Sequence, residues 1–325
     1  MKKYDNIIIG AGASGLYLGM FLKKTIILEK AMSVGNKLLI SGGGNCNFTN
    51  KNITHENYLS KNPDFVKYAL GNFKGLFSFL KENKLEWEEK THGRLFLKQK
   101  GKNLIDAFIK KQKAEIKTSY EVKSIEKKDS SYIINNEFEC NNLIIATGGM
   151  SYAGTDFGLK VAKQFGHKLV NTYPALVRVD VDDEKITSLA GLSVQDVKSK
   201  QFKDGIVFTK RGIGGPLVYQ LSLYLNSGDG IKLDFSECSH IPQRLRKLLN
   251  NKNELTITPK KTAGYKFAEA MAGGVDTSEI DEKTFESKKH KGLFFVGEVL
   301  DVTGNLGGYN LNFAFVSADC VRKML

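Results

Sequence analysis

The stretch YDNIIIGAGASGLYLGMFLKKTIILEK, residues 4–30, decides the fold of the N-terminal part of the chain. Residues 6–9 are a short run rich in β-branched side chains, which predicts a buried parallel strand. A G-x-G-x-x-G turn follows, formed by Gly10, Gly12 and Gly15, and it leads into a helical segment. Residues 25–28 predict a second strand that ends at Glu29. The stretch therefore contains, in order, a strand, a glycine turn, a helix, a second strand and an acidic residue.

Each part of this unit has a mechanical role in binding a dinucleotide. Gly10 allows a tight turn, Gly12 lets the backbone approach a pyrophosphate, and Gly15 lets helix and strand pack closely. The start of the helix offers unpaired N–H groups to the phosphates. Glu29 stands where an acid binds the ribose hydroxyls, and its charge disfavours the 2′-phosphate of NADP. NAD and FAD both remain open on this evidence.

The next stretch, AMSVGNKLLISGGGNCNFTN at residues 31–50, predicts a loop. Its glycines allow the backbone to lie flat against a planar ligand, with N–H groups directed at the ligand edge. Lys37 adds a positive charge suited to a phosphate or a flavin carbonyl. Cys46 lies in the same loop, and we interpret it as a small buried packing residue.

Two distant segments favour FAD over NAD. Residues 118–149 begin with short alternating strands, a β-meander, and end in a buried strand that runs into Ala-Thr-Gly-Gly at 146–149. Residues 293–296 predict another strand, followed by Gly297-Glu298, Asp301 and a glycine-rich turn at 304–308. A helix is expected from about Tyr309, with its positive end directed at the pyrimidine edge of a flavin.

Taken together, these segments resemble the BaiN/YhiN-like family of FAD-dependent oxidoreductases, also met as the aminoacetone oxidase family, of which this chain looks like a shortened member. The resemblance implies an α/β fold, in which a Rossmann-like FAD-binding domain of glutathione-reductase type carries an inserted β-rich domain. The chain departs from the family pattern in having Asn45 where an Arg is usual. It also lacks a helical segment before GGV at 273–275, which implies a more open site or a lid from another chain.

The motifs and the resemblance together give the expected cofactor-binding residues. They comprise the glycine turn, the acidic strand end, the glycine loop, the meander, the Ala-Thr-Gly-Gly segment and the C-terminal turn. These residues are Gly10, Gly12, Ala13, Ser14, Gly15, Glu29, Lys30, Lys37, Ser41, Gly42, Gly43, Gly44, Asn45, Cys46, Asn47, Val122, Ala146, Thr147, Gly148, Gly149, Gly297, Glu298, Asp301, Gly307, Gly308, Tyr309 and Asn310.

The expected domains are a discontinuous FAD-binding domain, 1–168 with 266–325, and an inserted β-rich substrate domain, 169–265. Within the insert, Pro216 predicts the start of a helix. Lys210 and Arg211 precede it in a turn that we interpret as a strand-to-helix connection rather than an anion site. There is no second complete G-x-G-x-x-G unit. Either a reductant such as NAD(P)H binds transiently over the flavin, or the electrons come from the substrate itself.

Composition limits the remaining possibilities. The net charge of +13 permits an RNA partner, but Lys supplies 42 of the 48 basic residues, which fits genome composition equally well. The spacing of cysteines and histidines supports neither a disulfide framework nor a metal site. No apolar run is long enough for a membrane helix, and we expect a cytoplasmic protein.

The catalytic residues are not identified by the sequence. Tyr152 and Tyr309 are adjacent to cofactor motifs and are candidates for moving a proton. Three substrates stay open: an enone steroid or bile-acid intermediate, a small amine, and a uridine in structured RNA, which we favour. The non-enzymatic alternative is an RNA-binding protein in which the flavin serves only as a folding ligand.

Overall fold

The computed structural model describes residues 1–71, 75–152, 154–226 and 228–325. The chain divides into two compact units. Unit 1 consists of Met1–Met150, Gly154–Thr172 and Gly273–Leu325, and unit 2 consists of Ser151–Ala153 and Tyr173–Ala272. The division into a cofactor domain and a substrate domain at residues 169 and 265 stays a prediction.

Unit 1 is built on a seven-stranded sheet in the order β7-β2-β1-β10-β9-β8, with β20 also paired to β10. The strands β7, β2, β1, β10 and β20 are parallel, whereas β8 and β9 join β10 as an antiparallel meander. β2 and β20 are buried throughout, as are the last residues of β1 and β10, which explains the apolar sequence of these parts. The strand bounds are β1 Lys2–Ile9, β2 Thr25–Leu28, β7 Glu115–Lys117, β8 Ile125–Lys128, β9 Ser131–Ile134, β10 Phe138–Ile145 and β20 Leu293–Phe295.

Two small sheets and seven helices complete unit 1 among the described residues. One sheet has the order β3-β6-β5 and the other pairs β21 with β4. Its helices are α1 Ala13–Gly19, α2 Asn36–Ile40, α3 Pro63–Leu70, α4 Phe77–Glu82, α5 Gly101–Lys110, α6 Phe157–Gln164 and α10 Tyr309–Met324. The short strands are β3 Asn47–Asn50, β4 Tyr58–Leu59, β5 Trp87–Lys90, β6 Arg94–Leu97 and β21 Thr303–Gly304.

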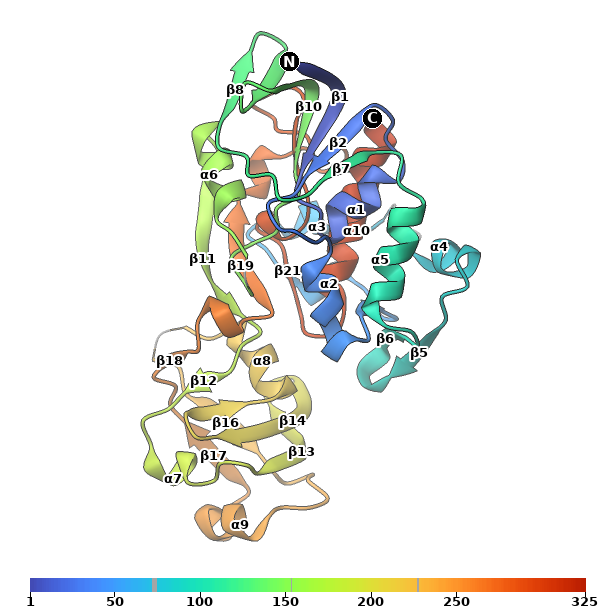
Figure 1. Ribbon diagram of the computed structural model, residues 1–325. Coiled ribbons are helices and arrows are strands. Elements are labelled where there is room, and N and C mark those ends of the chain that lie inside the picture. The colour runs from blue at the N-terminus through green and yellow to red at the C-terminus, as the bar shows by residue number, and fades with distance from the viewer. Residues whose placement is uncertain (72–74, 153, 227) are drawn as a thin grey trace. The chain divides into compact units, whose positions relative to one another are not determined.

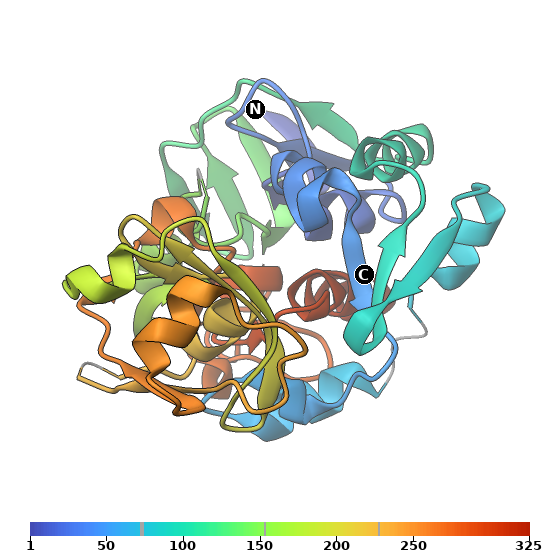
Figure 2. The ribbon, with the colours of Figure 1, turned by 90° about the horizontal axis from the view of Figure 1, so that it is seen from below.

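The long C-terminal helix α10 lies beside α1, as Figure 1 and Figure 2 show from two directions. The Tyr17 side chain of α1 packs against Phe315 of α10 and donates a hydrogen bond to the buried Asp319 at 3.1 Å. The two ends of the sequence are therefore joined in one core. This packing brings the glycine turn of β1 and α1 close to the segment that precedes α10.

The expectation of a loop throughout residues 31–50 is wrong. Residues 36–40 form α2, Ser41–Gly44 form a short 3₁₀ turn, η1, and residues 47–50 form β3. Leu38 is buried, and Gly35 starts α2 with a φ of 70°. A Cβ on Gly35 would lie 2.6 Å from Ile105 of α5. Packing against α5 therefore stabilises a helix that is too short to form alone.

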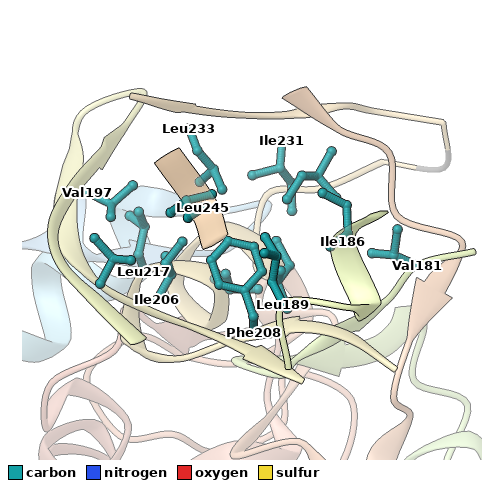
Figure 3. Close-up of a cluster of buried hydrophobic side chains, with 14 of the residues drawn as sticks. Val181, Ile186, Leu189, Val197, Ile206, Phe208, Leu217, Ile231, Leu233 and Leu245 are labelled. Atoms are coloured by element: carbon teal, nitrogen blue, oxygen red, sulfur yellow. The ribbon is translucent and has the colours of Figure 1, made fainter. Parts of the chain in front are cut away.

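Unit 2 contains an antiparallel sheet in the order β17-β16-β13-β14-β15-β12-β18. Its inner face and the helix α8 enclose an apolar core that includes Phe208, Ile206 and Leu217 (Figure 3). The elements are β12 Val179–Asp180, β13 Ser193–Ser199, β14 Phe202–Thr209, β15 Gly212–Gly214, β16 Ile231–Asp234, β17 Glu254–Ile257, β18 Lys261–Thr262, α7 Glu184–Thr187, α8 Pro216–Ser222 and α9 Gln243–Leu249.

The chain leaves and re-enters unit 1 along β11, Leu169–Ala175, and β19, Ala270–Val275, which pair with each other. Pro216 begins α8, as the sequence predicted, because proline fits the first turn of a helix. No helix in the described part of the chain is both long and apolar enough to cross a membrane.

Candidate functional site

The glycine turn after β1 combines tight packing with an open surface. A Cβ on Gly10 would lie 2.5 Å from the carbonyl oxygen of Ala146, and one on Gly15 would lie 2.0 Å from that of Gly10. These two glycines are therefore required by contact between the turn, α1 and β10. A Cβ on Gly12, in contrast, would meet no atom within 4 Å. The space above Gly12 is available to a ligand.

Glu29 is held rigidly beside this turn. One carboxylate oxygen accepts the N–H of Ala11 at 2.7 Å, and the other accepts the N–H of Ala31 at 2.8 Å. A carboxylate has about four lone-pair sites, so the two bonds leave capacity for ribose hydroxyls. Lys30, next in the chain, forms an exposed ion pair with Glu121 at 2.7 Å.

The segment that follows β7 runs alongside Glu29. The N–H of Tyr120 bonds to the carbonyl of Glu29, and the N–H of Ser119 bonds to that of Ala31, both at 2.9 Å. Val122 is buried at the end of this segment. The strand end that carries Glu29 and the segment that carries Val122 are thus one continuous edge of the site.

The glycine loop η1 exposes its backbone. Gly42, Gly43 and Gly44 all have positive φ values, of 56°, 67° and 89°. A Cβ on Gly43 would meet no atom within 4 Å, whereas one on Gly42 would lie 2.7 Å from the Phe96 ring. A side chain on Gly43 would therefore only fill the open space and add backbone strain, which fits a surface kept clear for a ligand.

The residues after η1 make internal contacts. The Asn45 amide oxygen accepts a hydrogen bond from Lys100 at 3.0 Å. Cys46 has a φ of 52° and is fully buried, and burial raises the pKa of its thiol to about 11. With its amide oxygen turned toward α10, Asn47 accepts the N–H of Gly308 at 3.0 Å. Cys46 is therefore a protonated packing residue, and Asn47 joins η1 to the C-terminal turn.

Three distant segments meet at Glu298. Its carboxylate lies 2.7 Å from Lys37 of α2, and it accepts the N–H of Gly149, after β10, at 3.4 Å. Glu298 stands in the short turn η6, Gly297–Val299, which directly follows β20. The Ala146 N–H bonds to Ile9, so the Ala-Thr-Gly-Gly segment also continues the edge of β1. The Glu298 carboxylate therefore connects η6 with α2 and with the segment that follows β10.

The turn from η6 to α10 is fixed by backbone contacts. A Cβ on Gly297 would lie 2.7 Å from the Ser14 hydroxyl of α1, and one on Gly308 would lie 2.4 Å from the Thr49 carbonyl. Asn50 donates to the Gly307 carbonyl at 3.1 Å. Close approach of β3 and α1 thus requires glycine at 297 and 308.

Several expected site residues have polar groups engaged within the protein. Asp301 accepts the N–H of Lys61 at 2.9 Å, and burial raises the pKa of its carboxyl group. Asn310 exchanges two hydrogen bonds with the backbone of Gly304. Tyr309 is buried and donates to the Asn52 carbonyl at 3.4 Å, and Tyr152 lies in unit 2 with 41% of its surface exposed. Their parts in binding or proton transfer stay predictions.

Sequence reasoning missed three residues of this region: Asn50, Arg94 and Lys100. Asn50 supports Gly307, Lys100 contacts Asn45, and a Cβ on Gly307 would lie 3.2 Å from Arg94. Asn50 ends β3, Arg94 begins β6, and Lys100 follows β6. No cofactor motif of the sequence includes these three residues. Only the polar end of FTN at 48–50, directly after the glycine loop, offered a signal.

The geometry fits a dinucleotide flavin. The turn at Gly12 and the loop at Gly43 both leave open space where side chains would stand, and Glu29 presents a fixed carboxylate at one end. Lys37 and Glu298 add a cation and an anion that contact each other. A phosphate-binding turn, a ribose acid and an exposed loop with a nearby charge pair are the parts that such a cofactor needs.

Comparison with known proteins agrees with this geometry. Residues 4–323 match the family model described as HI0933-like protein Rossmann domain. The chain belongs to this family. It is 31% identical to the ribosomal RNA dihydrouridine synthase of Escherichia coli K12, over 100% of this chain and 99% of that protein. It is 25% identical to the 3-dehydro-bile acid delta(4,6)-reductase of Clostridium scindens, over 95% of this chain and 96% of that protein.

Among solved structures, a 3-ketosteroid-delta4-(5alpha)-dehydrogenase from Rhodococcus jostii RHA1 has a TM-score of 0.56 at 10% identity. The match covers 99% of this chain and 97% of that one and shows a shared fold. The family resemblance inferred from the motifs is confirmed, as is the α/β fold with its Rossmann-type FAD-binding domain. The protein is a FAD-dependent oxidoreductase of the HI0933-like family.

Proposed function

We propose that the protein reduces a uridine in ribosomal RNA to dihydrouridine. The observation that carries this proposal is the full-length similarity to ribosomal RNA dihydrouridine synthases. The relative from Haemophilus influenzae is 32% identical over 98% of both chains, alongside the Escherichia coli protein. The net charge of +13 is consistent with a polyanionic substrate.

The chemistry follows from the structure of uracil. Its C5=C6 bond is conjugated with the C4 carbonyl, so C6 accepts a hydride and C5 then accepts a proton. When bound, FAD would take up a hydride from a reductant of the NAD(P)H class, and the reduced flavin would then supply that hydride to C6. The C5=C6 π bond is lost, and one C–H bond forms at each carbon.

The residues of unit 1 hold and orient the cofactor in this proposal. Glu29 binds the ribose of the adenosine half, and the turn at Gly12 receives the pyrophosphate. Lys37 and Glu298 lie at the flavin end, where the ammonium group stabilises negative charge and the carboxylate binds hydroxyls. The exposed backbone at Gly43 leaves room for a planar ring.

The proton for C5 has to come from a group that can reach the substrate. Cys46 is fully buried and its pKa is raised to about 11, so its thiol is a poor acid here. Tyr309 is buried and hydrogen-bonded to Asn52, and burial raises its pKa. Tyr152, an exposed residue of unit 2, is a candidate from the sequence alone. Tyr152→Phe tests it: slower uridine reduction with unchanged FAD binding would assign the proton to its hydroxyl.

The test uses ribosomal RNA from a strain that lacks the gene. We expect this RNA to lack one dihydrouridine, detected as the loss of two hydrogens from one nuclease fragment in mass spectrometry. Purified protein with FAD and NADPH should restore that fragment, and Glu29→Ala protein at the same FAD concentration should restore it far more slowly. If RNA from the deletion strain keeps every dihydrouridine, the proposal fails.

The second candidate is reduction of an enone in a small steroid. The similarity to the bile-acid reductase favours it, and the reaction again adds a hydride and a proton across a conjugated C=C bond. The same enzyme preparation should be offered a 3-oxo-4,6-diene steroid. Turnover of the steroid with no change in ribosomal RNA would select this candidate.

A further inference from the structure

The sheet of unit 2 has one outer region that the cofactor chemistry does not explain. It lies where β12 pairs with β15 on one side and with β18 on the other. Figure 1 labels β12 and β18. Val179 of β12 and Ile213 of β15 face each other and belong to the apolar core. Because side chains alternate along a strand, Arg178 and Asp180 point to the opposite, outer face.

The charge on this outer face is arranged around one buried carboxylate. Asp180 receives a guanidinium on each oxygen, Arg178 at 2.8 Å and Arg211 at 2.8 Å. One acid therefore serves two arginines, and a positive charge is left over. The Arg211 side chain is 62% exposed, so its remaining N–H groups are open to a ligand.

Neighbouring lysines add to this positive charge. Lys261 lies opposite Asp180 in the strand register, and Lys266 follows four residues after β18. Within the part of the chain that the structure describes, neither forms an ion pair with a carboxylate. Lys260, in contrast, forms an ion pair with Asp182 at 2.8 Å. The next acidic residue along the chain after these lysines is Glu269, which is exposed.

An aromatic ring stands among these cations. Phe267 is 51% exposed, although it is the kind of side chain that normally contributes to a core. The Arg178 guanidinium lies 5.0 Å from its ring centre, and the Lys266 ammonium lies 5.9 Å from it. The N–H of Tyr152 bonds to the Tyr265 carbonyl at 3.0 Å and brings a second exposed aromatic residue to the same turn.

We propose that this surface, formed by Arg178, Arg211, Lys261, Lys266 and Phe267, binds an unpaired segment of the RNA substrate. The inference rests on the proposed function and adds the place where unit 2 contacts RNA. An exposed ring next to guanidinium and ammonium groups is the combination that binds single-stranded RNA, with a base stacked on the ring and phosphates on the cations. Arg211 and the two lysines contact the backbone, and Phe267 stacks.

The test measures binding of the FAD-loaded full chain to a fluorescent single-stranded RNA that contains the target uridine. We expect Phe267→Ala to bind about 5- to 150-fold more weakly, the range for loss of one base–aromatic stack. Phe267→Trp should keep or improve affinity. The double change Lys261→Gln with Lys266→Gln should reduce the slope of log affinity against log salt by about 1.4.

The matched control is Lys198→Gln with Lys203→Gln. These lysines belong to the same unit but share Glu237 as their ion-pair partner. Because they lie outside the proposed surface, the control should bind RNA with an affinity within about twofold of the parent's and with the same salt slope. All variants should retain FAD and its reduction by NADPH, since no substituted residue belongs to unit 1. The thermal transition of each variant reports whether it is folded.

Three outcomes overturn the inference. In one, Phe267→Ala and the double lysine variant bind RNA like the parent while the parent still produces dihydrouridine, so the proposed function survives without this surface. In a second, the parent does not bind RNA and the deletion strain keeps its dihydrouridine, and both proposals fail. Equal losses of affinity in the Lys198 control would show that only overall charge matters and would also overturn the inference.

Discussion

The ammonium group of Lys37 lies 2.7 Å from the carboxylate of Glu298, although 261 residues separate them in the sequence. The pair joins α2 to the turn that follows β20. Glu298 also accepts the N–H of Gly149. A single carboxylate thereby links three segments that each carry an expected flavin contact, so its loss should affect the cofactor more than the fold.

Lys37→Met and Glu298→Gln should each weaken FAD binding by about tenfold or more, the effect of losing one charge-assisted hydrogen bond. Lys37→Met should also lower the midpoint potential of the bound flavin, because a positive charge that stabilises the reduced form is removed. Equilibrium titration with FAD and a spectroscopic redox titration measure the two effects. Lys102→Met, which removes an exposed ion pair with Asp106 on α5, is the control.

The double variant separates a shared role from two independent ones. Since the two groups contact each other, the loss in FAD affinity should be smaller than the sum of the single losses. Strict additivity would contradict the coupling between the two groups. A redox potential unchanged by Lys37→Met would contradict the placement of Lys37 at the flavin.

Gly12 and Gly15 should respond in opposite ways to a side chain. Gly12→Val should leave the thermal transition of the apoprotein nearly unchanged but reduce FAD affinity by more than tenfold, because its side chain enters open space. Gly15→Ala should destabilise the fold by about 2 kcal/mol or more, since its Cβ would lie 2.0 Å from the Gly10 carbonyl. Melting curves with and without FAD measure both. A yellow Gly12→Val protein with parental affinity would be incompatible with this site.

The sequence was informative where spacing has a mechanical meaning. The unit from β1 to Glu29, the strand before Ala-Thr-Gly-Gly and the helix from Tyr309 could all be placed because most glycines there have a required conformation or a close contact, while Gly12 leaves space for a ligand. The loop at Gly42–Gly44 was also expected, although α2 before it was not. A five-residue helix has no periodicity to detect and depends on contact with α5.

Contacts between distant residues could not be predicted. Nothing near Asn45 in the sequence indicates Lys100, and nothing near Lys37 indicates that Glu298 is its partner. The sequence also did not predict the group of charged and aromatic residues on the outer face of unit 2. Arg178 and Phe267 are far apart in the chain, and only the pairing of β12 with β18 brings their segments together.

The contact between Asn45 and Lys100 predicts how the chain tolerates the arginine that the family resemblance leads one to expect. Asn45→Arg should place a guanidinium beside the Lys100 ammonium and lower stability by about 0.2–0.5 kcal/mol through like-charge repulsion. Adding Lys100→Asp should restore the thermal midpoint. The two single variants and the double variant, compared by differential scanning calorimetry, test this coupling. A fully stable Asn45→Arg protein would show that Lys100 moves away without cost.

A buried network of hydrogen bonds in unit 1 surrounds His167. Its Nε2 lies 2.8 Å from the Ser287 hydroxyl, and its Nδ1 lies 3.3 Å from the Glu279 carboxylate. Ser287 also accepts the N–H groups of Lys289 and His290. These contacts connect the end of α6 to the segment before β20, and the His167 side chain is completely buried.

This burial predicts a loss of stability in mild acid. Burial lowers the pKa of His167 below its ordinary value of about 6.5, and Glu279 opposes the shift only in part. The unfolded chain therefore binds a proton more readily than the folded chain. Stability should be complete above about pH 6.5 and should fall, by up to about 1.4 kcal/mol per pH unit, as the pH drops toward the folded-state pKa. Thermal midpoints between pH 5 and 7.5 measure this slope.

In His167→Gln the slope should be smaller and the midpoint at pH 7.5 lower, while replacement of the exposed His240 by Gln should change neither. An unchanged slope in His167→Gln would assign the acid sensitivity to other groups, since the imidazole is then not what the proton binds.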